Sequence, residues 1–529
     1  MRMSRTLNAA AAILLLSGAA FAANAQQRPG GAPGGGNFPG AQQGAGRGGA
    51  DSNGVAPVQK VSVTHHTVNV GGTQIAYTAH AGTLVLRDDN GKPNASVFFI
   101  AYTRDGQDAA KRPLTFFFNG GPGSASIWLN MGIMSPRAPL MAPGGTQPAP
   151  PYTLADNQNT PLDVTDLVQV DAMMTGYSRP APGVSPSQFT GDRNDIRMFA
   201  QFIRNYLDEY NRWSSPKYLF GESYGTFRSA GLASELQSNE GIELNGIMLL
   251  GTVLDFQMIQ PGTTNDIGFA SYFPSYTATA WFHKKLPPDM QKQSLAQVVE
   301  QSRKYAFGDY LTTLARGNTL SDAERSAAAQ KIASLTGVTD KFVGQTNLRI
   351  DPSTFRSELM RNERLTLGRY DSRMIGMNGN ATSTRPDYDP SDVAPTGAFM
   401  SGFMRYLHDD LDYRSTLQYA MSGATGGWQY SSAGRGYPSE MEALRSAMAK
   451  DPYLHVMVGA GYYDLATPFG GAEFMFSHLG YDKTYSDRVQ FKYYESGHMA
   501  YLNQDSARQL KKDIASFINA TKAPTSGEY

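Results

Sequence analysis

The chain has 529 residues, of which 41% are hydrophobic and 17% charged, so it can bury a large core in one elaborated domain or in two. Its 46 basic and 46 acidic residues cancel to a formal net charge of zero, and no global field attracts nucleic acid or an anionic membrane. The absence of cysteine excludes disulfides, thiol chemistry and zinc–cysteine sites.

The first 25 residues have the pattern of a secretory signal peptide. Arg2 and Arg5 precede an apolar run over 9–16, and small residues at 23–25 form a cleavage site. The apolar run is too short to span a bilayer comfortably, and no later stretch is long and apolar enough. We therefore expect a signal peptide over 1–25 and export through the secretory pathway, to the periplasm or outside the cell, without a membrane span.

Residues 26–54 are rich in Gly, Pro, Gln and Ala and lack the apolar residues that would offset chain ordering, which predicts a flexible tether. From Lys60 to Tyr102, alternating apolar residues broken by glycine-containing turns predict an antiparallel meander. His65 and His66 lie there, and adjacent residues of a strand point to opposite faces. This favours structural or surface roles for both histidines over a metal site.

A buried strand is predicted over Leu114–Phe118, and it leads into the glycine-rich loop 119–126. Consecutive glycines let backbone amides approach a ligand without side-chain obstruction, as the oxyanion hole facing a nucleophile requires. The alternatives are a phosphate-binding loop or a plain turn. A phosphate-binding loop needs Gly-Lys-Ser/Thr, which is absent here.

Apolar residues at helical spacing predict a helix over Gly191–Arg212 that packs on the sheet and carries no chemistry, with Asp192 placed to cap it. A second strand and helix flank the sequence Gly221-Glu-Ser-Tyr-Gly225. A serine hydroxyl needs an exposed position beside a base, and a tight strand-to-helix turn between two glycines provides it. Ser223 is therefore the candidate nucleophile. The structural alternative is an ordinary glycine-rich turn.

Two motifs in this order, Asn119-Gly-Gly-Pro-Gly123 and Gly221-Glu-Ser-Tyr-Gly225, resemble the serine carboxypeptidase family of α/β-hydrolases. The resemblance extends through Asp163–Asp171 and Thr175–Ser178 and resumes near the C-terminus. It implies an α/β-hydrolase fold with a largely parallel sheet, helices on both faces, an N-terminal β extension and an inserted helical cap.

The rest of the chain supplies the cap and the remaining strands. Leu244–Leu254 is predicted to be a strand with Asp255 at its end, and 261–450 is helical, as expected of the cap. We therefore divide the hydrolase into 55–260 and 451–529, with the cap inserted between them. The Tyr and Met residues of the cap are interpreted mainly as core.

The acid and the base follow by elimination, since α/β-hydrolases order them as Ser, then Asp or Glu, then His. Between Asp451 and Glu473 the only acid is Asp464, just after a predicted strand. Of the two later histidines, His478 lies in a predicted helix, whereas His498 follows the strand predicted over 489–494. His498 is the candidate base, and both choices match motifs of the family. A helix over 505–519 closes the fold.

The predicted mechanism has Ser223 attack a carbonyl carbon while His498 transfers the proton and Asp464 holds the imidazole. The backbone amides of Tyr224 and, by resemblance, Gly121 would form the oxyanion hole. No metal or organic cofactor is required.

By resemblance, Asn119 and Glu222 bind the terminal carboxylate of a peptide, with Glu222 protonated so that it donates. The family usually has a further Glu soon after the glycine loop, but Leu129–Pro136 contains no acid. We therefore expect a serine-type carboxypeptidase that acts on peptides with a free C-terminus. The alternatives are an esterase or other acyl hydrolase or acyltransferase and, from another class, a non-catalytic secreted binding protein.

Overall fold

The computed structural model describes residues 57–423, 428–431, 436–480 and 483–522. The expected signal peptide over 1–25 and the tether over 26–54 lie outside these residues. None of the described helices combines the length and the apolar character that a bilayer crossing requires.

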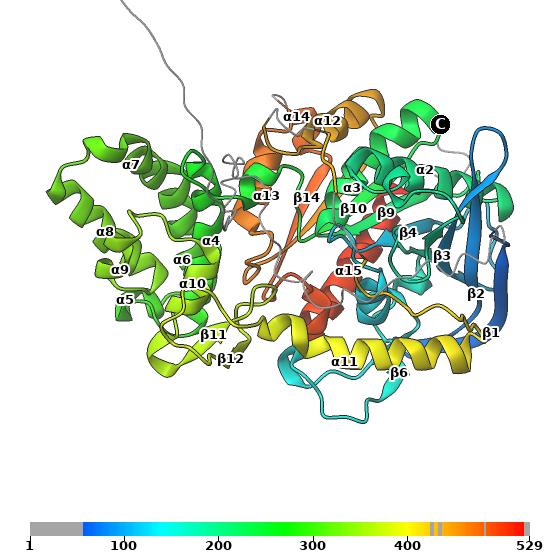
Figure 1. Cartoon of the computed structure of the whole chain (residues 1–529), viewed down its shortest axis with the longest axis horizontal. Helices are drawn as coiled ribbons and strands as arrows, with labels where there is room; N and C mark the ends of the chain where they lie inside the picture. Colours follow the sequence, from blue (N-terminus) through cyan, green and yellow to red (C-terminus); the bar gives the residue numbers. More distant parts are fainter. Residues whose placement is uncertain (1–56, 424–427, 432–435, 481–482, 523–529) are drawn as a thin grey trace, which may run out of the picture. The chain divides into compact units, whose positions relative to one another are not determined.

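One mixed sheet of ten strands organises the described chain (Figure 1). Its order is β1-β2-β3-β7-β4-β9-β10-β13-β14, with β8 paired to β3. The strands are β1 (Lys60–Val70), β2 (Thr73–Arg87), β3 (Pro93–Arg104), β4 (Leu114–Phe118), β7 (Asp166–Val170), β8 (Arg179–Pro180), β9 (Lys217–Glu222), β10 (Gly246–Leu250), β13 (His455–Gly461) and β14 (Val489–Tyr494).

The first three strands form the predicted antiparallel meander, and β3 pairs antiparallel with β7. From β7 to β14 every neighbouring pair is parallel. All residues of β4, β7 and β10 are buried, as expected of strands that are covered on both faces. In β4, Phe117 packs into one core and Phe116 and Phe118 into the other, because successive side chains point to opposite faces.

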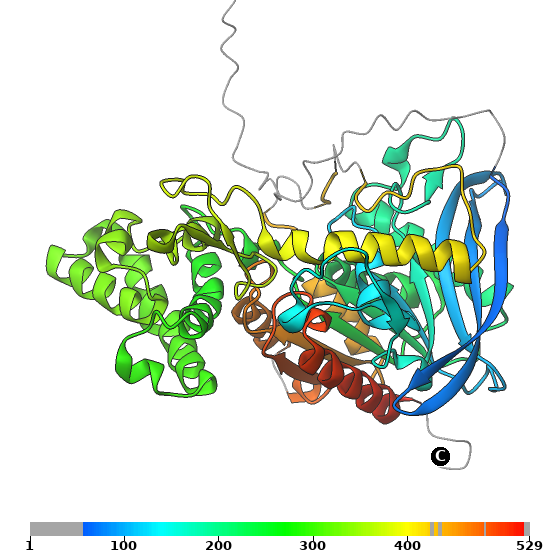
Figure 2. The ribbon, with the colours of Figure 1, turned by 90° about the horizontal axis from the view of Figure 1, so that it is seen from below.

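Helices cover both faces, which confirms the predicted α/β-hydrolase architecture. One face packs against α2 (Asp192–Glu209), α3 (Tyr224–Glu235), α12 (Met441–Lys450) and α13 (Phe469–Ser477). The opposite core includes α11 (Pro390–Arg405) and α15 (Gln504–Thr521), which run along the same side of the sheet in Figure 2. The closing helix predicted over 505–519 is thus present as α15.

The segment between β10 and β13 is mostly helical, and much of it packs in a third hydrophobic cluster, which also includes Ala460 of β13 and Tyr463, Leu465 and Phe469 after it. Besides α11 and α12, the described part of this segment contains seven α-helices and two short strands. They are α4 (Asp266–Phe282), α5 (Pro288–Gln291), α6 (Leu295–Tyr305), α7 (Leu311–Arg316), α8 (Asp322–Thr336), α9 (Asp340–Gln345), α10 (Pro352–Glu358), β11 (Leu365–Leu367) and β12 (Ile375–Met377).

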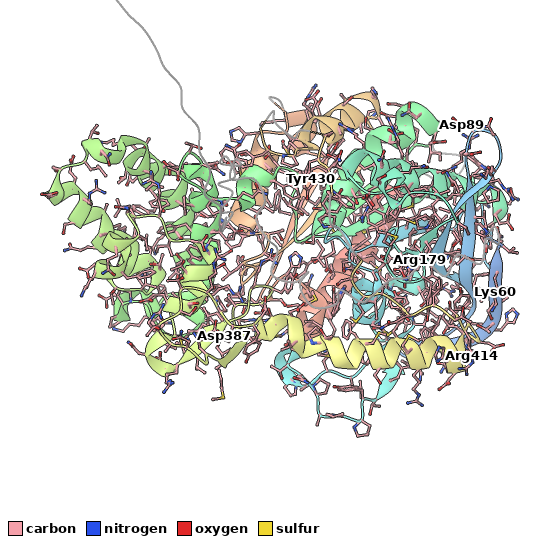
Figure 3. The ribbon with its side chains drawn as sticks, viewed as in Figure 1. Lys60, Asp89, Arg179, Asp387, Arg414 and Tyr430 are labelled. Carbon is pink, nitrogen blue, oxygen red and sulfur yellow. The ribbon has the colours of Figure 1, made fainter. Side chains whose placement is uncertain are left out.

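The later part of this segment, from α11 onward, packs on the sheet-bearing part of the chain. Phe399 and Phe403 of α11 belong to the same core as residues of β1, β2 and β3. Lys60 Nζ on β1 donates to the carbonyl of Arg414 at 3.3 Å, and both side chains lie at one edge in Figure 3. Arg179, also labelled there, donates to the carbonyl of Gln418 at 3.3 Å.

Two local predictions were wrong. Gly191, not Asp192, is the N-cap of α2, and the carboxylate of Asp192 instead accepts hydrogen bonds from the backbone N–H and the hydroxyl of Ser431. The strand predicted over 244–254 is shorter, because β10 ends at Leu250. Asp255 lies beyond it and caps a short 3₁₀ turn by accepting from the N–H of Gln257.

Candidate active site

Ser223 lies at the turn between β9 and α3, as predicted. Its backbone has φ 61° and ψ −130°, a conformation that is rare for a residue with a side chain and typical of strained functional turns. The Ser223 N–H donates to the carbonyl of Leu250 on β10 at 3.0 Å. A Cβ at Gly221 would lie 2.2 Å from the carbonyl oxygen of Gly225, so the turn needs glycine there. Ser223 itself is partly exposed, whereas both its neighbours are buried.

Asp464 follows the end of β13, and His498 follows the end of β14. The two side chains are joined by a 2.7 Å hydrogen bond from His498 Nδ1 to Asp464 Oδ2, and both are buried. Asp464 also accepts from the N–H groups of Ala466 and Thr467 and from the hydroxyl of Thr467. Because a carboxylate only accepts, Nδ1 of the neutral imidazole carries the proton and Nε2 is left with a lone pair.

The electrostatics of His498 are set mainly by burial and by Asp464. Burial alone would lower the pKa of His498, but the Asp464 carboxylate and the hydrogen bond to it outweigh that effect and raise the pKa above its ordinary value. A Cβ at Gly251 would lie 2.6 Å from the His498 ring, and Gly251 directly follows Leu250, which accepts from Ser223. The imidazole therefore packs beside the serine turn. Within the described chain, no hydrogen bond joins the Ser223 hydroxyl to it.

The glycine-rich loop 119–126 packs directly against the backbone of the turn that holds Ser223. A Cβ at Gly120 would lie 2.3 Å from the backbone nitrogen of Tyr224, which only glycine avoids. The N–H of Tyr224 is the first of α3, so it has no partner within the helix. Gly121 follows with φ 103°, where a side chain would be strained. The two candidate oxyanion donors thus belong to adjoining backbone segments.

Asn119 and Glu222 are brought together next to Ser223, since Glu222 directly precedes it in the chain. Asn119 Nδ2 donates to Glu222 Oε1 at 2.8 Å, and Asn119 Oδ1 accepts from the N–H of Leu129 at 2.9 Å. Both side chains are only 3% exposed. Burial raises the pKa of Glu222 to about 7, although the nearby His498 lowers it in part. The neutral acid is therefore well populated below neutral pH.

Three further residues support the site and were not predicted from the sequence. Thr467 holds Asp464, as described above. Arg228 on α3 is fully buried, donates to the Asn119 carbonyl at 2.8 Å and pairs with Asp195 on α2 at 2.7 Å. Tyr501 packs near Glu222. An arginine within the apolar run of α3 is the one sequence signal that points to such a role.

The other histidines considered from the sequence lie elsewhere. His478 is the exposed C-cap of α13, and His65 and His66 interact with threonine hydroxyls on the meander. Across the residues that the structure describes, no group of three or more His, Asp or Glu side chains could hold a metal ion.

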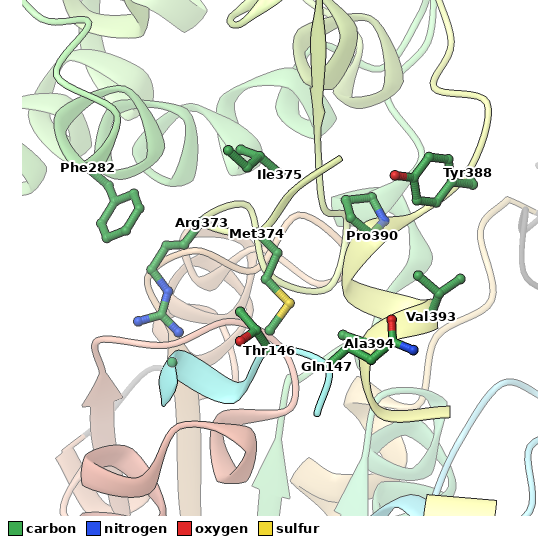
Figure 4. Close-up of a pocket in the computed structure, with 11 residues that line it drawn as sticks. Thr146, Gln147, Phe282, Arg373, Met374, Ile375, Tyr388, Pro390, Val393 and Ala394 are labelled. Carbon is green, nitrogen blue, oxygen red and sulfur yellow. The ribbon is translucent and has the colours of Figure 1, made fainter. Parts of the chain in front are cut away.

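A cavity of about 610 Å³ lies next to the His498 loop. Its wall includes Arg373, which donates to the carbonyl of Glu495, and Met374 (Figure 4). Three residues before Arg373, the ring of Tyr370 lies 5.3 Å from that of His498, and its carbonyl accepts from the His498 N–H. The other walls are largely apolar, and the exposed large hydrophobic side chains among them are Phe282, Ile375, Tyr388 and Val393.

The chain is similar in sequence to a known protein family and to a curated relative. The family model described as serine carboxypeptidase matches residues 72–512. A Carboxypeptidase Y homolog from Arthroderma benhamiae is 32% identical over 135 residues, which cover 25% of this chain and 24% of that protein. The match therefore spans about a quarter of the curated relative's length.

Among solved structures, a prohormone-processing carboxypeptidase from Saccharomyces cerevisiae has a TM-score of 0.54 at 15% sequence identity. The similarity covers 84% of this chain and 92% of that one. At this identity it shows a shared fold.

Proposed function

The chain belongs to the serine carboxypeptidase family, and from that premise we propose that it is a serine hydrolase that removes C-terminal residues from peptides. The observation that carries the proposal is that two buried polar pairs lie beside the Ser223 turn. The hydrogen-bonded pair of His498 and Asp464 can move a proton, and the pair of Asn119 and Glu222 can bind a carboxylate.

In this mechanism the Ser223 hydroxyl attacks the carbonyl carbon of the last peptide bond, and His498 Nε2 takes its proton. Oxyanion character develops where the Tyr224 and Gly121 amides can donate to it, and one such donor contributes about 3 to 4 kcal/mol in comparable hydrolases. His498 then gives its proton to the leaving amine, which produces an acyl-enzyme and the free C-terminal residue. Water attacks the acyl-enzyme with His498 again as base, and Ser223 is regenerated.

Recognition of the free C-terminus is assigned to Asn119 and Glu222. With the pKa of Glu222 raised to about 7 by burial, the neutral acid can donate to a substrate carboxylate rather than repel it. The amide of Asn119 uses one hydrogen on Glu222, which leaves its second for the substrate.

The experiment that tests the function is incubation of the purified protein with a mixed peptide library, followed by mass spectrometry. Loss of single residues from the C-terminus only is the expected result. Cleavage within peptides, or no cleavage of peptides alongside hydrolysis of simple esters, would contradict it.

An esterase, another acyl hydrolase or an acyltransferase is the second candidate, favoured by the absence of an acid in Leu129–Pro136. A binding protein without activity has no use for a hydrogen-bonded Asp464 and His498 beside a strained serine. We also propose that 261–450 acts as a cap on the hydrolase formed by 55–260 and 451–529. The N-terminal sequence supports export to the periplasm or outside the cell.

A further inference from the structure

One buried tyrosine beside Glu222 has no function in the mechanism above. Tyr501 lies in the short turn after His498 and is 2% exposed, yet its hydroxyl makes no hydrogen bond within the described chain. The second carboxyl oxygen of Glu222, Oε2, is likewise buried and without a partner. The hydroxyl lies close enough to Glu222 and Asn119 for weak hydrogen-bonding interactions, which lower the pKa of Glu222, but neither contact has the geometry of a formed hydrogen bond. Two buried polar atoms without a fully formed hydrogen bond therefore lie close together.

Their chemistry is complementary to a carboxylate. Glu222 Oε1 accepts from Asn119 Nδ2, so in the neutral acid the proton lies on Oε2. Oε2–H and the phenol of Tyr501 are then two neighbouring O–H donors, and a carboxylate offers two acceptor oxygens. Buried donors normally have partners, so a pair without them indicates a place that a ligand fills.

We propose that Tyr501 is a third residue of the substrate-carboxylate site, donating a hydrogen bond to the terminal carboxylate together with protonated Glu222. The inference rests on the proposed carboxypeptidase function and deepens it. It concerns the part of the site where this sequence lacks the acid that is usual in the family, within Leu129–Pro136.

The packing of Tyr501 agrees with that role. A Cβ at Gly132 would lie 2.2 Å from Tyr501 Cδ2, so the phenol ring lies directly on the backbone of Leu129–Pro136. The segment that lacks the acid thus has an aromatic ring against it. The titratable groups that act on Glu222 and Tyr501 are His498, Asp464 and Tyr370, and of these only His498 favours a negative charge at Glu222.

The test compares Tyr501→Phe with wild type on one peptide supplied as the free acid and as the C-terminal amide. Loss of a donor to a charged group should lower kcat/KM for the free acid about 10- to 100-fold and leave the amide within about threefold. Tyr310→Phe is the matched control, because Tyr310 also has a buried hydroxyl, which donates to the carbonyl of Leu348 far from this cluster. It should change neither rate.

A second measurement does not depend on turnover. L-phenylalanine and L-phenylalaninamide are used as inhibitors, and only the affinity for the free acid should fall in Tyr501→Phe. If that variant does not fold, Gly132→Ala replaces it, because the added methyl group must displace the Tyr501 ring. The same selective loss is then expected.

The outcomes separate the two ideas. If wild type prefers the free acid and Tyr501→Phe keeps that preference, or loses both substrates equally, the role of Tyr501 is wrong and the carboxypeptidase proposal stands. If wild type treats acid and amide alike, the carboxypeptidase proposal itself fails.

Discussion

Two buried polar clusters lie beside the Ser223 turn, and they differ in how completely their hydrogen bonds are made. Asp464 accepts from two backbone N–H groups, from Thr467 and from His498. In the cluster of Asn119, Glu222 and Tyr501, two oxygens have no partner among the described residues. A buried polar atom without a partner costs about 1 to 3 kcal/mol, so the second cluster is less stable in the free protein than the first.

This difference agrees with the proposed roles, catalysis for the first cluster and carboxylate binding for the second. A catalytic base must keep one tautomer and one orientation through every step, which a fully bonded acid enforces. A substrate-binding group must instead keep donors available until the substrate arrives. Changes in the first cluster should therefore affect every substrate, and changes in the second should affect only substrates with a free carboxylate.

The largest effect is expected at the residue that both clusters serve. Ser223→Ala removes the nucleophile and should abolish turnover of free acid, amide and ester alike. A fluorophosphonate probe should label wild type at Ser223 only and should not label the variant. Labelling that survives the substitution would show that another residue is the nucleophile.

The next effect separates the two C-terminal histidines. His498→Ala removes the proposed base and should lower kcat by several orders of magnitude for every substrate. His478→Ala is the matched control, because His478 is exposed at the end of α13 and should change kcat by no more than a few-fold. Equal losses in both variants, or a larger loss at His478, would contradict the assignment of the base.

The sequence predicted the first cluster better than the second, for physical reasons. A strand that is buried on both faces is a continuous apolar run, so 114–118 was predicted with its observed bounds. The edge strand 489–494 is only half-buried, but its aromatic residues also predicted its observed bounds. Asp464 and His498 come shortly after predicted strands, and elimination then selects them. The cap of α2 was misplaced because Asp192 bonds to Ser431, which is distant in sequence.

Contacts between residues that are distant in sequence also explain why the rest of the second cluster was not predicted. Tyr501 meets Gly132 across more than 300 residues of chain, and no local pattern marks either partner. Arg228 pairs with Asp195 on another helix, where only tertiary packing explains an arginine inside an apolar run. The sequence therefore predicts residues that lie on motifs, and it misses residues that act through packing between distant segments.

Glu222→Gln tests the second cluster through pH. In wild type, kcat/KM for a free-acid peptide should rise as His498 loses its proton and fall as Glu222 ionises near its pKa of about 7. Glutamine keeps a donor but cannot ionise, so the alkaline decline should flatten. The negative charge of Glu222 raises the pKa of His498, so the amide profile should shift slightly to lower pH in the variant. Coincident acid and amide profiles in wild type would contradict carboxylate recognition.

The same variant has a thermodynamic signature. Because burial raises the pKa of Glu222 above that of the unfolded chain, its neutral form contributes stability fully below about pH 4.5, and that contribution is lost as pH rises through about 7. Urea unfolding at pH 5 and pH 8 should therefore show wild type losing more stability than Glu222→Gln between the two values. Parallel losses would mean that Glu222 is not buried as a neutral acid.

The smallest effect is expected at Thr467, whose hydroxyl donates to Asp464 Oδ2 at 2.8 Å. Thr467→Val keeps the shape of the side chain, and Asp464 retains two backbone donors and His498. Losing one hydrogen bond of about 1 kcal/mol should lower kcat/KM about fivefold. The loss should be equal for free acid and amide, since the first cluster serves both.

Thr336→Val is the matched control for this change, because Thr336 also has a buried hydroxyl, bonded to the Ile332 carbonyl within α8. It should alter the melting temperature but not kcat/KM. Parallel kinetics on acid and amide peptides would place Thr467 with His498 and Asp464. A loss confined to the free acid would show instead that the two clusters share their donors, and the division of labour between them would have to be abandoned.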